Sequence, residues 1–529
     1  MTAQPRDPAP HFRDDERHPA VWAAKTPDRP AIIDARDGSV ITYAQYEARS
    51  NRVAHLMRAA GLKPGDHMAV FLENRPDYSL LVWGAWRAGL RVTAIPTHLT
   101  PDEIDYILAD CGARLLITSA AKADVAAQLR AAGVPAEARF MIDGAAPGFV
   151  ALEPALDALP DTRIPDEVEG IEMLYSSGTT GRPKGVLKPL PPEPFGTPSR
   201  GFLMAATRWG FDENTVWLHP SPMYHAAPLG YALRVIRFGG TIVSVPRFDP
   251  EQCLALIEKH RVTHSQWVPT HFVRLLRLPE EVRAKYDVSS LKSAIHAAAP
   301  CPVDVKKAMI AWWGPVIDEY YAGSEGNGMT TISSEEYLRK PGSVGRALIG
   351  KIRICDDDGE ELPVGSEGVI YYSDNPVFEY HNDPAKTAES RNRHGWSTLG
   401  DVGYLDEEGY LFLTDRRSFM IVSGGVNIYP AEVENLLISC PGVGDVAVIG
   451  VPNDEFGEEV KAVVEPINPA AAGPELEADI IAWCRARLSH VKCPRSVDFV
   501  DRLPRGDNGK LYKRKIRDAY WEGRGRRIA

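Results

Sequence analysis

Residues 171–185 read Ile-Glu-Met-Leu-Tyr-Ser-Ser-Gly-Thr-Thr-Gly-Arg-Pro-Lys-Gly and join a short apolar run to a loop of small and hydroxylated residues. Glycines let backbone N–H groups point inward, hydroxyls add donors, and Lys184 adds a cation, a combination that suits a polyphosphate. The stretch is not a Walker A loop, because Gly181 is followed by Arg-Pro-Lys and not by Lys-Ser or Lys-Thr. A flexible solvent loop is the simpler interpretation of such a composition, but the Pro-Lys-Gly ending makes this stretch less generic.

The segments around this loop alternate between helices and short apolar strands. Thr42 and Gln45 form a capping-box pattern before a helix that ends at Gly61, and residues 68–72 follow as a buried strand. Similar apolar runs occur at 115–118, 241–245, 262–268 and 316–321. This alternation predicts an α/β fold with largely parallel sheets, in which ligands bind outside the carboxyl ends of the strands.

The pattern changes near Leu413. Beyond it the sequence predicts a helix, two strands, a loop and a second helix, at residues 430–439, 446–451, 461–465, 468–474 and 476–488. This order predicts a small α+β domain of its own. From Leu503 onward Lys and Arg outnumber Asp and Glu, and these cations are either solvated or in part bound to phosphates.

Composition excludes several classes of protein. The 529 residues carry a formal net charge of −11, so no global basic field attracts nucleic acid. The seven cysteines form no CxxC pair, which leaves no zinc spacing and no disulfide framework. Residues 1–17 contain no apolar run typical of a signal peptide, and arginines interrupt the hydrophobic stretch 80–95. We expect a cytoplasmic protein with no nucleic-acid partner and no membrane insertion.

Two short motifs resemble known catalytic or binding motifs. Residues 442–447 match the dinucleotide fingerprint GxGxxG/A by letters, but they follow a predicted helix and open a strand, which is the reverse of the required order. Residues 322–326, Ala-Gly-Ser-Glu-Gly, nearly match the GxSxG nucleophile elbow after a predicted strand. A serine hydrolase that uses Ser324 is therefore one alternative, and a polar turn at the end of a strand is the simpler interpretation.

Several ordered segments together resemble the acyl-CoA synthetases of the adenylate-forming superfamily, which also contains nonribosomal adenylation domains and firefly luciferase. The resemblance spans residues 176 to 510. The matching segments are 176–185 (SSGTTGRPKG), 223–225 (MYH), 298–302 (AAPCP), 320–325 (YYAGSE), 342–345 (GSVG), 395–401 (GWSTLGD), 415–416 (DR), 424–434 (GGVNIYPAEVE) and 503–510 (LPRGDNGK).

The resemblance implies a fold, a reaction and a set of cofactors. It implies an α/β protein with a large N-terminal domain of stacked α/β sheets plus a β-barrel-like subdomain (residues 1–415), followed by a small mobile α+β C-terminal domain (residues 416–529). The implied enzyme is an acid–thiol ligase that uses ATP, Mg²⁺ and coenzyme A. It converts a carboxylic acid to an acyl-adenylate and then transfers the acyl group to CoA with release of AMP.

The resemblance also implies residue roles. Thr179, Thr180 and backbone amides of the loop would cover the β- and γ-phosphates of ATP, Glu325 would hold Mg²⁺, and Ser324 would contact the α-phosphate. Ala298, Ala299 and the Tyr321 ring would form a slot for adenine, and Asp401 would accept hydrogen bonds from the ribose hydroxyls. The implied nucleotide-binding set is Ser176, Ser177, Gly178, Thr179, Thr180, Gly181, Lys184, Ala298, Ala299, Tyr320, Tyr321, Asp401 and Arg416.

The remaining implied roles belong to the two half-reactions. Lys510 would bridge the substrate carboxylate and the α-phosphate, and His225 would border the acyl site. The C-terminal domain would then rotate about Ser418 so that Gly424 and Gly425 face the site during thioester formation. In this family the hinge is usually lysine or aspartate, so Ser418-Phe419 raises an alternative in which only adenylation is efficient and the thioester is weakly formed or made by another protein.

Small residues near His225 and Ala298 suggest space for a bulky apolar acid, such as a fatty, aromatic or polycyclic terpenoid acid. The expected partners are this acid, ATP and free CoA, and a homodimer is a possible assembly. Three classes therefore compete: a ligase, a serine hydrolase and a noncatalytic nucleotide-binding module.

Overall fold

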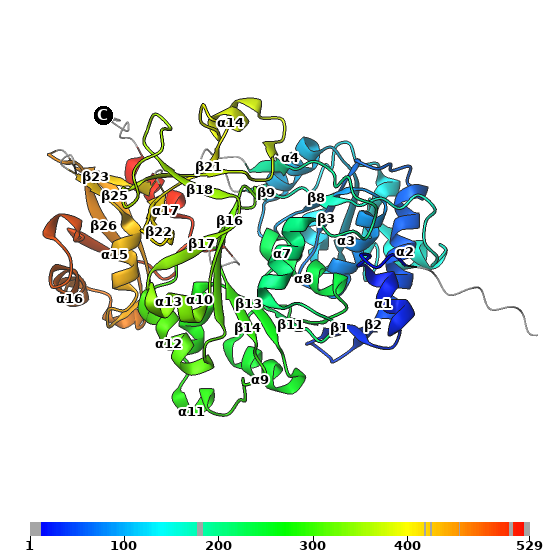
Figure 1. The fold of residues 1–529 in the computed structure, drawn as a ribbon, viewed down its shortest axis with the longest axis horizontal. Helices are drawn as coiled ribbons and strands as arrows, with labels where there is room; N and C mark the ends of the chain where they lie inside the picture. Colours follow the sequence, from blue (N-terminus) through cyan, green and yellow to red (C-terminus); the bar gives the residue numbers. More distant parts are fainter. Residues whose placement is uncertain are drawn as a thin grey trace, which may run out of the picture. The chain divides into compact units, whose positions relative to one another are not determined.

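The computed structural model describes residues 12–176, 183–416, 419–423, 426–453, 455–506 and 511–522, apart from the side chains of Asp415, Arg416 and Asn427. Figure 1 labels the helices and strands along the chain. The chain divides into two compact units. One contains residues 1–266, 280–293 and 377–384, and the other contains residues 267–279, 294–376 and 385–529.

The first unit contains a parallel six-stranded sheet in the order β7-β6-β5-β3-β4-β8. Its strands are β3 (His67–Phe71), β4 (Arg91–Ala94), β5 (Ala113–Ser119), β6 (Arg139–Ile142), β7 (Val150–Ala151) and β8 (Ile171–Glu172). Residues 68–71 of β3 have no exposed surface, as expected for an apolar strand covered on both faces. The predicted strands at 68–72 and 115–118 are thus confirmed within one or two residues.

Two further groups of strands belong to this unit. Strands β13-β11-β12-β1-β2 are adjacent in that order, and only the pair β1–β2 among their described pairs is antiparallel. A small antiparallel sheet has the order β20-β10-β9. The strands are β1 (Pro30–Asp34), β2 (Val40–Thr42), β9 (Tyr175–Ser176), β10 (Lys184–Leu187), β11 (Val216–His219), β12 (Thr241–Ser244), β13 (His264–Trp267) and β20 (Glu379–Tyr380).

Helix α2 (Tyr43–Ala59) shows why the local signals were reliable. The Thr42 side chain accepts a hydrogen bond from the Gln45 N–H, and the Gln45 side chain accepts one from the Thr42 N–H, as the sequence predicted. The other helices of this unit are α1 (Pro19–Lys25), α3 (Asp77–Arg87), α4 (Pro101–Cys111), α5 (Ala123–Ala126), α6 (Leu152–Asp157), α7 (Arg200–Trp209), α8 (Ala226–Arg237), α9 (Pro250–His260) and α11 (Glu280–Arg283).

In the second unit, β14 and β15 are parallel and the strands that follow are antiparallel, in the order β18-β19-β21-β22-β17-β16-β15-β14. These strands are β14 (Ser293–His296), β15 (Ile317–Ala322), β16 (Met329–Ile332), β17 (Ser343–Ile349), β18 (Lys351–Cys355), β19 (Gly368–Ser373), β21 (Ser397–Leu405) and β22 (Leu411–Arg416). Helices α10 (Pro269–Leu276), α12 (Val303–Trp313), α13 (Ser334–Arg339) and α14 (Pro384–Glu389) accompany them.

The C-terminal part has its own sheet, ordered β24-β23-β26-β25 with β27 beside β26. Its elements are β23 (Ile421–Ser423), β24 (Val426–Ile428), α15 (Pro430–Leu437), β25 (Val443–Asn453), β26 (Gly457–Pro466), α16 (Pro474–Arg485), β27 (Ser496–Phe499) and α17 (Lys513–Trp521), drawn from yellow to red in Figure 1. A separate core that includes Val433, Val448 and Ile480 packs between its helices and sheet. The predicted order of helix, two strands, loop and helix is confirmed.

The fold class is therefore the predicted one: an α/β protein with large sheets and a separate C-terminal α+β domain. The boundary between residues 415 and 416 stays a prediction. Among the described helices, none combines the length and the apolar character needed to cross a bilayer.

Buried His219, at the end of β11, generates a prediction about stability. Burial lowers its pKa from 6.5 to about 3. Below pH 6.5 His219 therefore binds a proton in the unfolded chain, whereas in the folded chain it stays neutral until the pH approaches 3. The contribution of neutral His219 to the unfolding free energy is complete above pH 6.5 and is lost as the pH falls toward 3. At pH 5 the loss is about 2 kcal/mol.

We expect His219→Phe to reduce the fall in unfolding free energy between pH 7.5 and pH 5, measured by urea denaturation and circular dichroism. His490→Asn removes an exposed histidine and serves as the control. An identical pH dependence in the His219→Phe variant and the wild type would contradict the prediction.

Candidate active site

Strand β15 ends in a tight polar turn. The Gly326 N–H donates to the Gly323 carbonyl across 3.1 Å, and Glu325 within the turn is only 8% exposed. A Cβ at Gly323 would lie 2.2 Å from Leu399 Cδ1 and 2.8 Å from Glu325 Oε2, so any other residue here would displace the Leu399 or Glu325 side chain. The turn thus places Ser324 and Glu325 at the carboxyl end of a strand that has a parallel neighbour, where ligands of α/β proteins bind.

The turn argues against the hydrolase alternative. A nucleophile elbow needs a strand, a sharp turn and then a helix. Here β15 is followed by β16, which pairs with it antiparallel from Tyr321 opposite Thr330 to Ala322 opposite Met329. Ser324 therefore lies in a hairpin connection. Residues 442–447 lie at the start of β25, after α15, so the order is helix then strand, as the sequence predicted, and the dinucleotide fingerprint does not apply.

Tyr321 and Asp401 were both predicted as nucleotide-binding residues, and they are in contact. The Tyr321 hydroxyl donates to Asp401 Oδ2 across 2.6 Å, and Asp401 is 6% exposed. Asp401 in β21 is the direct register partner of Arg416 in β22. An acidic group held by a phenol and flanked by an arginine position is suited to accept hydrogen bonds from a diol.

Ala298 and Ala299 lie in the connection from β14 to α12. Strands β14 and β15 are parallel, with His296 opposite Glu319, so the ends of both strands meet at one edge of the sheet. Ala298 has φ +77°, a left-handed backbone conformation that residues other than glycine rarely adopt. Such a backbone persists only where its surroundings fix it. The two predicted parts of the adenine slot, this loop and the end of β15 with Tyr321, thus share an edge.

A buried charged cluster connects the elements on either side of this loop, and the sequence did not predict it. Lys306 Nζ donates to Glu319 Oε2 across 2.5 Å, and His296 Nε2 lies 3.5 Å from the same oxygen. Lys306 also lies over the Tyr337 ring at 3.8 Å. Burial raises the pKa of Glu319, against the lowering effect of Lys306, and burial lowers the pKa of His296. The cluster joins β14, α12 and β15, and its member His296 lies two residues before Ala298 in the chain.

Glu325 fits the role predicted for it toward Mg²⁺. This ion is commonly held by one or two carboxylates together with substrate phosphates and water, so a single buried carboxylate at a strand end is a sufficient protein contribution. No cluster of three or more His, Cys, Asp or Glu capable of holding a metal occurs in the described part of the chain. A metal held by Glu325 would complete its coordination with phosphate oxygens and water.

The predicted residues of the first unit occupy two places. Ser176 and Lys184 are register partners in the antiparallel pair β9–β10, so they frame the glycine-rich loop at its base. Lys184 Nζ lies 3.0 Å from Asp383 Oδ2. His225 occupies the N-cap position of α8, with its ring centroid 4.5 Å from that of Tyr224.

The remaining predictions lie outside the described residues or side chains. They are Ser177, Gly178, Thr179, Thr180, Gly181, Ser418, Gly424, Gly425 and Lys510, together with the side chain of Arg416. Asp383, by contrast, is described but was not predicted. Its only local signal is its place before Pro384, a pattern typical of a helix start.

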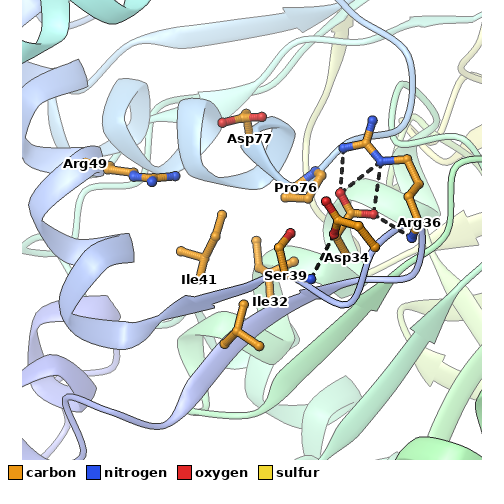
Figure 2. A pocket seen from close by; sticks show the side chains of 10 residues that line it. Ile32, Asp34, Arg36, Ser39, Ile41, Arg49, Pro76 and Asp77 are labelled. Carbon is orange, nitrogen blue, oxygen red and sulfur yellow. Dashed lines mark hydrogen bonds and ion pairs between the residues drawn. The ribbon is translucent and has the colours of Figure 1, made fainter.

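A cavity of about 230 Å³ lies in the first unit, between β1, β2 and the start of α3. Figure 2 shows Asp34 on its wall, joined to Arg36 across 2.5 Å, while Arg49 and Asp77 approach from other sides. None of the predicted site residues lines this cavity, so it carries no argument about the reaction.

These observations define an α/β protein with candidate nucleotide-binding groups at the carboxyl ends of its strands. Residues 20–380 match the model of the AMP-binding enzyme family, and residues 432–510 match its AMP-binding enzyme C-terminal domain. The chain belongs to this family, and with it to the adenylate-forming superfamily that its motifs resemble.

Three relatives illustrate the similarity. Long-chain-fatty-acid–CoA ligase FadD13 of Mycobacterium tuberculosis is 32% identical over 94% of this chain and 97% of its own length. Feruloyl-CoA synthase of Amycolatopsis is 35% identical over 91% of this chain and 94% of its own. The crystal structure of ATP-bound MatB from Rhodopseudomonas palustris superposes with a TM-score of 0.79 at 31% identity, over 95% of this chain and 99% of that one.

Asp401 provides the test of the nucleotide site. We expect Asp401→Asn to weaken AMP binding by about tenfold or more, because a neutral amide with one acceptor oxygen replaces a charged carboxylate with two as the partner of the ribose hydroxyls. Isothermal titration calorimetry with AMP measures this change. Glu407→Gln removes an exposed carboxylate from the neighbouring hairpin and should leave the affinity unchanged. Equal AMP affinity in Asp401→Asn and wild type would contradict the assignment.

Proposed function

We propose that this protein activates a hydrophobic carboxylic acid, in fatty, aromatic or polycyclic terpenoid form, and transfers it to CoA. Membership of the AMP-binding enzyme family is the observation that carries the reaction class. The protein is an enzyme, an AMP-forming acid–CoA ligase that uses ATP, Mg²⁺ and CoA. The names of FadD13 and feruloyl-CoA synthase, a fatty and an aromatic acid ligase, support the substrate class.

The reaction proceeds in two displacements. A carboxylate oxygen of the acid attacks the α-phosphorus of ATP in line, and the bond to the leaving pyrophosphate breaks. The thiolate sulfur of CoA then attacks the acyl carbonyl carbon, and AMP leaves with the electron pair of the broken C–O bond. Positioning and electrostatic stabilisation supply most of the rate in such displacements, because little covalent chemistry is left to the protein.

Our assignment of residues follows the geometry of each unit. In the second unit, the buried Asp401, held by Tyr321, orients the ribose, and the end of β15 with the Ala298 loop receives the adenine. Glu325 contributes the carboxylate toward Mg²⁺, which when bound neutralises phosphate charge. In the first unit, Lys184 supplies a cation toward the polyphosphate, and His225 borders the acid. Lys510 is assigned the bridging role at the α-phosphate.

The alternatives are less well supported. The hairpin after β15 lacks the helix that a nucleophile elbow requires, which removes the main reason for a serine hydrolase. Adenylation without thioester formation rested on Ser418-Phe419 alone, and the CoA ligases among the relatives do not favour it. A noncatalytic module is also disfavoured by the match to both family models. A cytoplasmic location and a homodimeric assembly remain proposals.

The decisive experiment is ATP–pyrophosphate exchange over a panel of carboxylic acids, repeated with CoA and scored for acyl-CoA. We expect exchange that depends on a long-chain or aromatic acid, and acyl-CoA formation when CoA is added. Lys510→Ala should lower exchange by at least a hundredfold, because it removes the cation that stabilises the transition state. Ser324→Ala should reduce exchange only several-fold.

Three outcomes would contradict parts of this proposal. Loss of all activity in Ser324→Ala with full activity in Lys510→Ala would support the hydrolase. Exchange without any acyl-CoA would support the adenylation-only alternative. An absence of acid-dependent exchange across the whole panel would contradict the assignment of the protein as a ligase.

A further inference from the structure

Segment 379–383, far along the chain from the glycine-rich loop, is attached to the base of that loop. Val186 and Leu187 of β10 are the antiparallel partners of Tyr380 and Glu379 in β20. The His381 N–H then donates to the Gly185 carbonyl across 2.8 Å. Both strands that frame the loop, β9 and β10, therefore belong to a sheet that β20 completes.

The attachment is close. A Cβ at Gly185 would lie 2.7 Å from Met173 Cε, 3.1 Å from Tyr175 Cζ and 3.2 Å from His381 Cβ. The absence of a side chain at Gly185 thus lets the backbone after Lys184 lie directly against His381. Contacts of this kind fix the relative position of two backbones to within a fraction of an ångström.

The end of helix α4 anchors both sides of this arrangement. The Asp110 carbonyl is contacted by His381 Nε2 at 3.0 Å and accepts a hydrogen bond from Asn382 Nδ2 at 3.2 Å. The Asp110 carboxylate accepts a hydrogen bond from the Tyr175 hydroxyl across 2.5 Å. Tyr175 immediately precedes Ser176, so one residue ties the incoming strand of the loop and the segment 381–382 to the same helix.

Within this fixed frame, Asp383 meets the only lysine of the loop. Lys184 Nζ lies 3.0 Å from Asp383 Oδ2, with side chains 16% and 36% exposed. The ammonium also lies 5.8 Å from the centroid of the Tyr380 ring. Because both backbones are held by the β10–β20 pairing, only the two side chains must be ordered when the ion pair forms. Lys184 is therefore compensated by a carboxylate before any phosphate arrives.

We propose that Asp383 is the internal counter-ion of Lys184 and that it sets the affinity of this lysine for polyphosphate. The inference rests on the proposed function, in which Lys184 faces the polyphosphate of ATP. A phosphate that approaches Lys184 competes with Asp383 for the ammonium hydrogens and is repelled by the carboxylate. The pair thus weakens binding of both ATP and departing pyrophosphate, and it favours pyrophosphate release after the first displacement. Asp383 acts through Lys184 and is a positioning residue.

The test is pyrophosphate binding to the full-length protein by isothermal titration calorimetry. Asp383→Asn removes the charge and keeps the shape, and we expect the Kd for pyrophosphate to fall roughly three- to tenfold, as for a unit charge about 6 Å away in a partly aqueous setting. The dependence of this Kd on salt should steepen, because Lys184 becomes an uncompensated cation. A merely structural role of Asp383 predicts the opposite, a weaker affinity.

Three further variants sharpen the test. Asp383→Glu keeps the charge and should behave as wild type. Glu379→Gln removes an exposed carboxylate from the same segment, 379–383, and controls for a general change of charge. In a Lys184→Met background, Asp383→Asn should increase the affinity clearly less than in the wild-type background, because only the direct repulsion between the carboxylate and the phosphate is then relieved.

The outcomes separate this inference from the proposed function. Wild-type protein that catalyses acid-dependent exchange and binds pyrophosphate, with unchanged or weaker binding in Asp383→Asn, overturns the counter-ion role alone. An increase of affinity that is equally large in the Lys184→Met background also overturns it. Wild-type protein that neither binds pyrophosphate nor catalyses exchange overturns both proposals.

Discussion

Strand β15 has a parallel neighbour, β14, on one side and an antiparallel neighbour, β16, on the other. A parallel connection needs a crossover of a dozen or more residues, which helix α12 provides, and it returns the chain to the same edge of the sheet. An antiparallel connection needs only a short turn. The reversal at β15 therefore brings the loop after β14 and the turn after β15 to one edge, and a polar hairpin connection closes that edge.

The same reversal determines which side chains support this edge. Glu319 lies two residues before Tyr321, so both side chains point to the same side of β15. Glu319 forms the buried ion pair with Lys306 of α12, and Tyr321 reaches Asp401. Removing one partner of a buried ion pair typically costs 3–5 kcal/mol, because the other charge is left without compensation. The cluster therefore holds β14, α12 and β15 together beneath Ala298, where the backbone adopts an unfavourable φ.

Local patterns predicted most elements, whereas contacts distant in sequence could not be predicted. The capping box of α2 and the apolar runs of β3 and β5 involve residues only a few positions apart, and each element lies within one or two residues of its predicted place. Family resemblance alone assigned Tyr321 and Asp401 to the nucleotide, and the hydrogen bond between them was not predicted. No local pattern marks Lys306 and Glu319 as a buried pair, since they lie on different elements and meet only in the folded chain. The pairing of Lys184 with Asp383 depends on the register of β10 with β20, which no local signal encodes.

Three charged side chains, Asp401, Glu319 and Lys184, already have a partner within their own unit. Asp401 accepts a hydrogen bond from Tyr321, Glu319 is paired with Lys306, and Lys184 is paired with Asp383. A bare charge must lose its water when a ligand binds, whereas a paired charge exchanges one partner for another inside a fixed frame. Groups held in this way also need no reorganisation when charge develops during the reaction. In the proposed function, the partners that Asp401 and Lys184 have before binding therefore set how strongly these two groups hold the nucleotide and how readily they release the product.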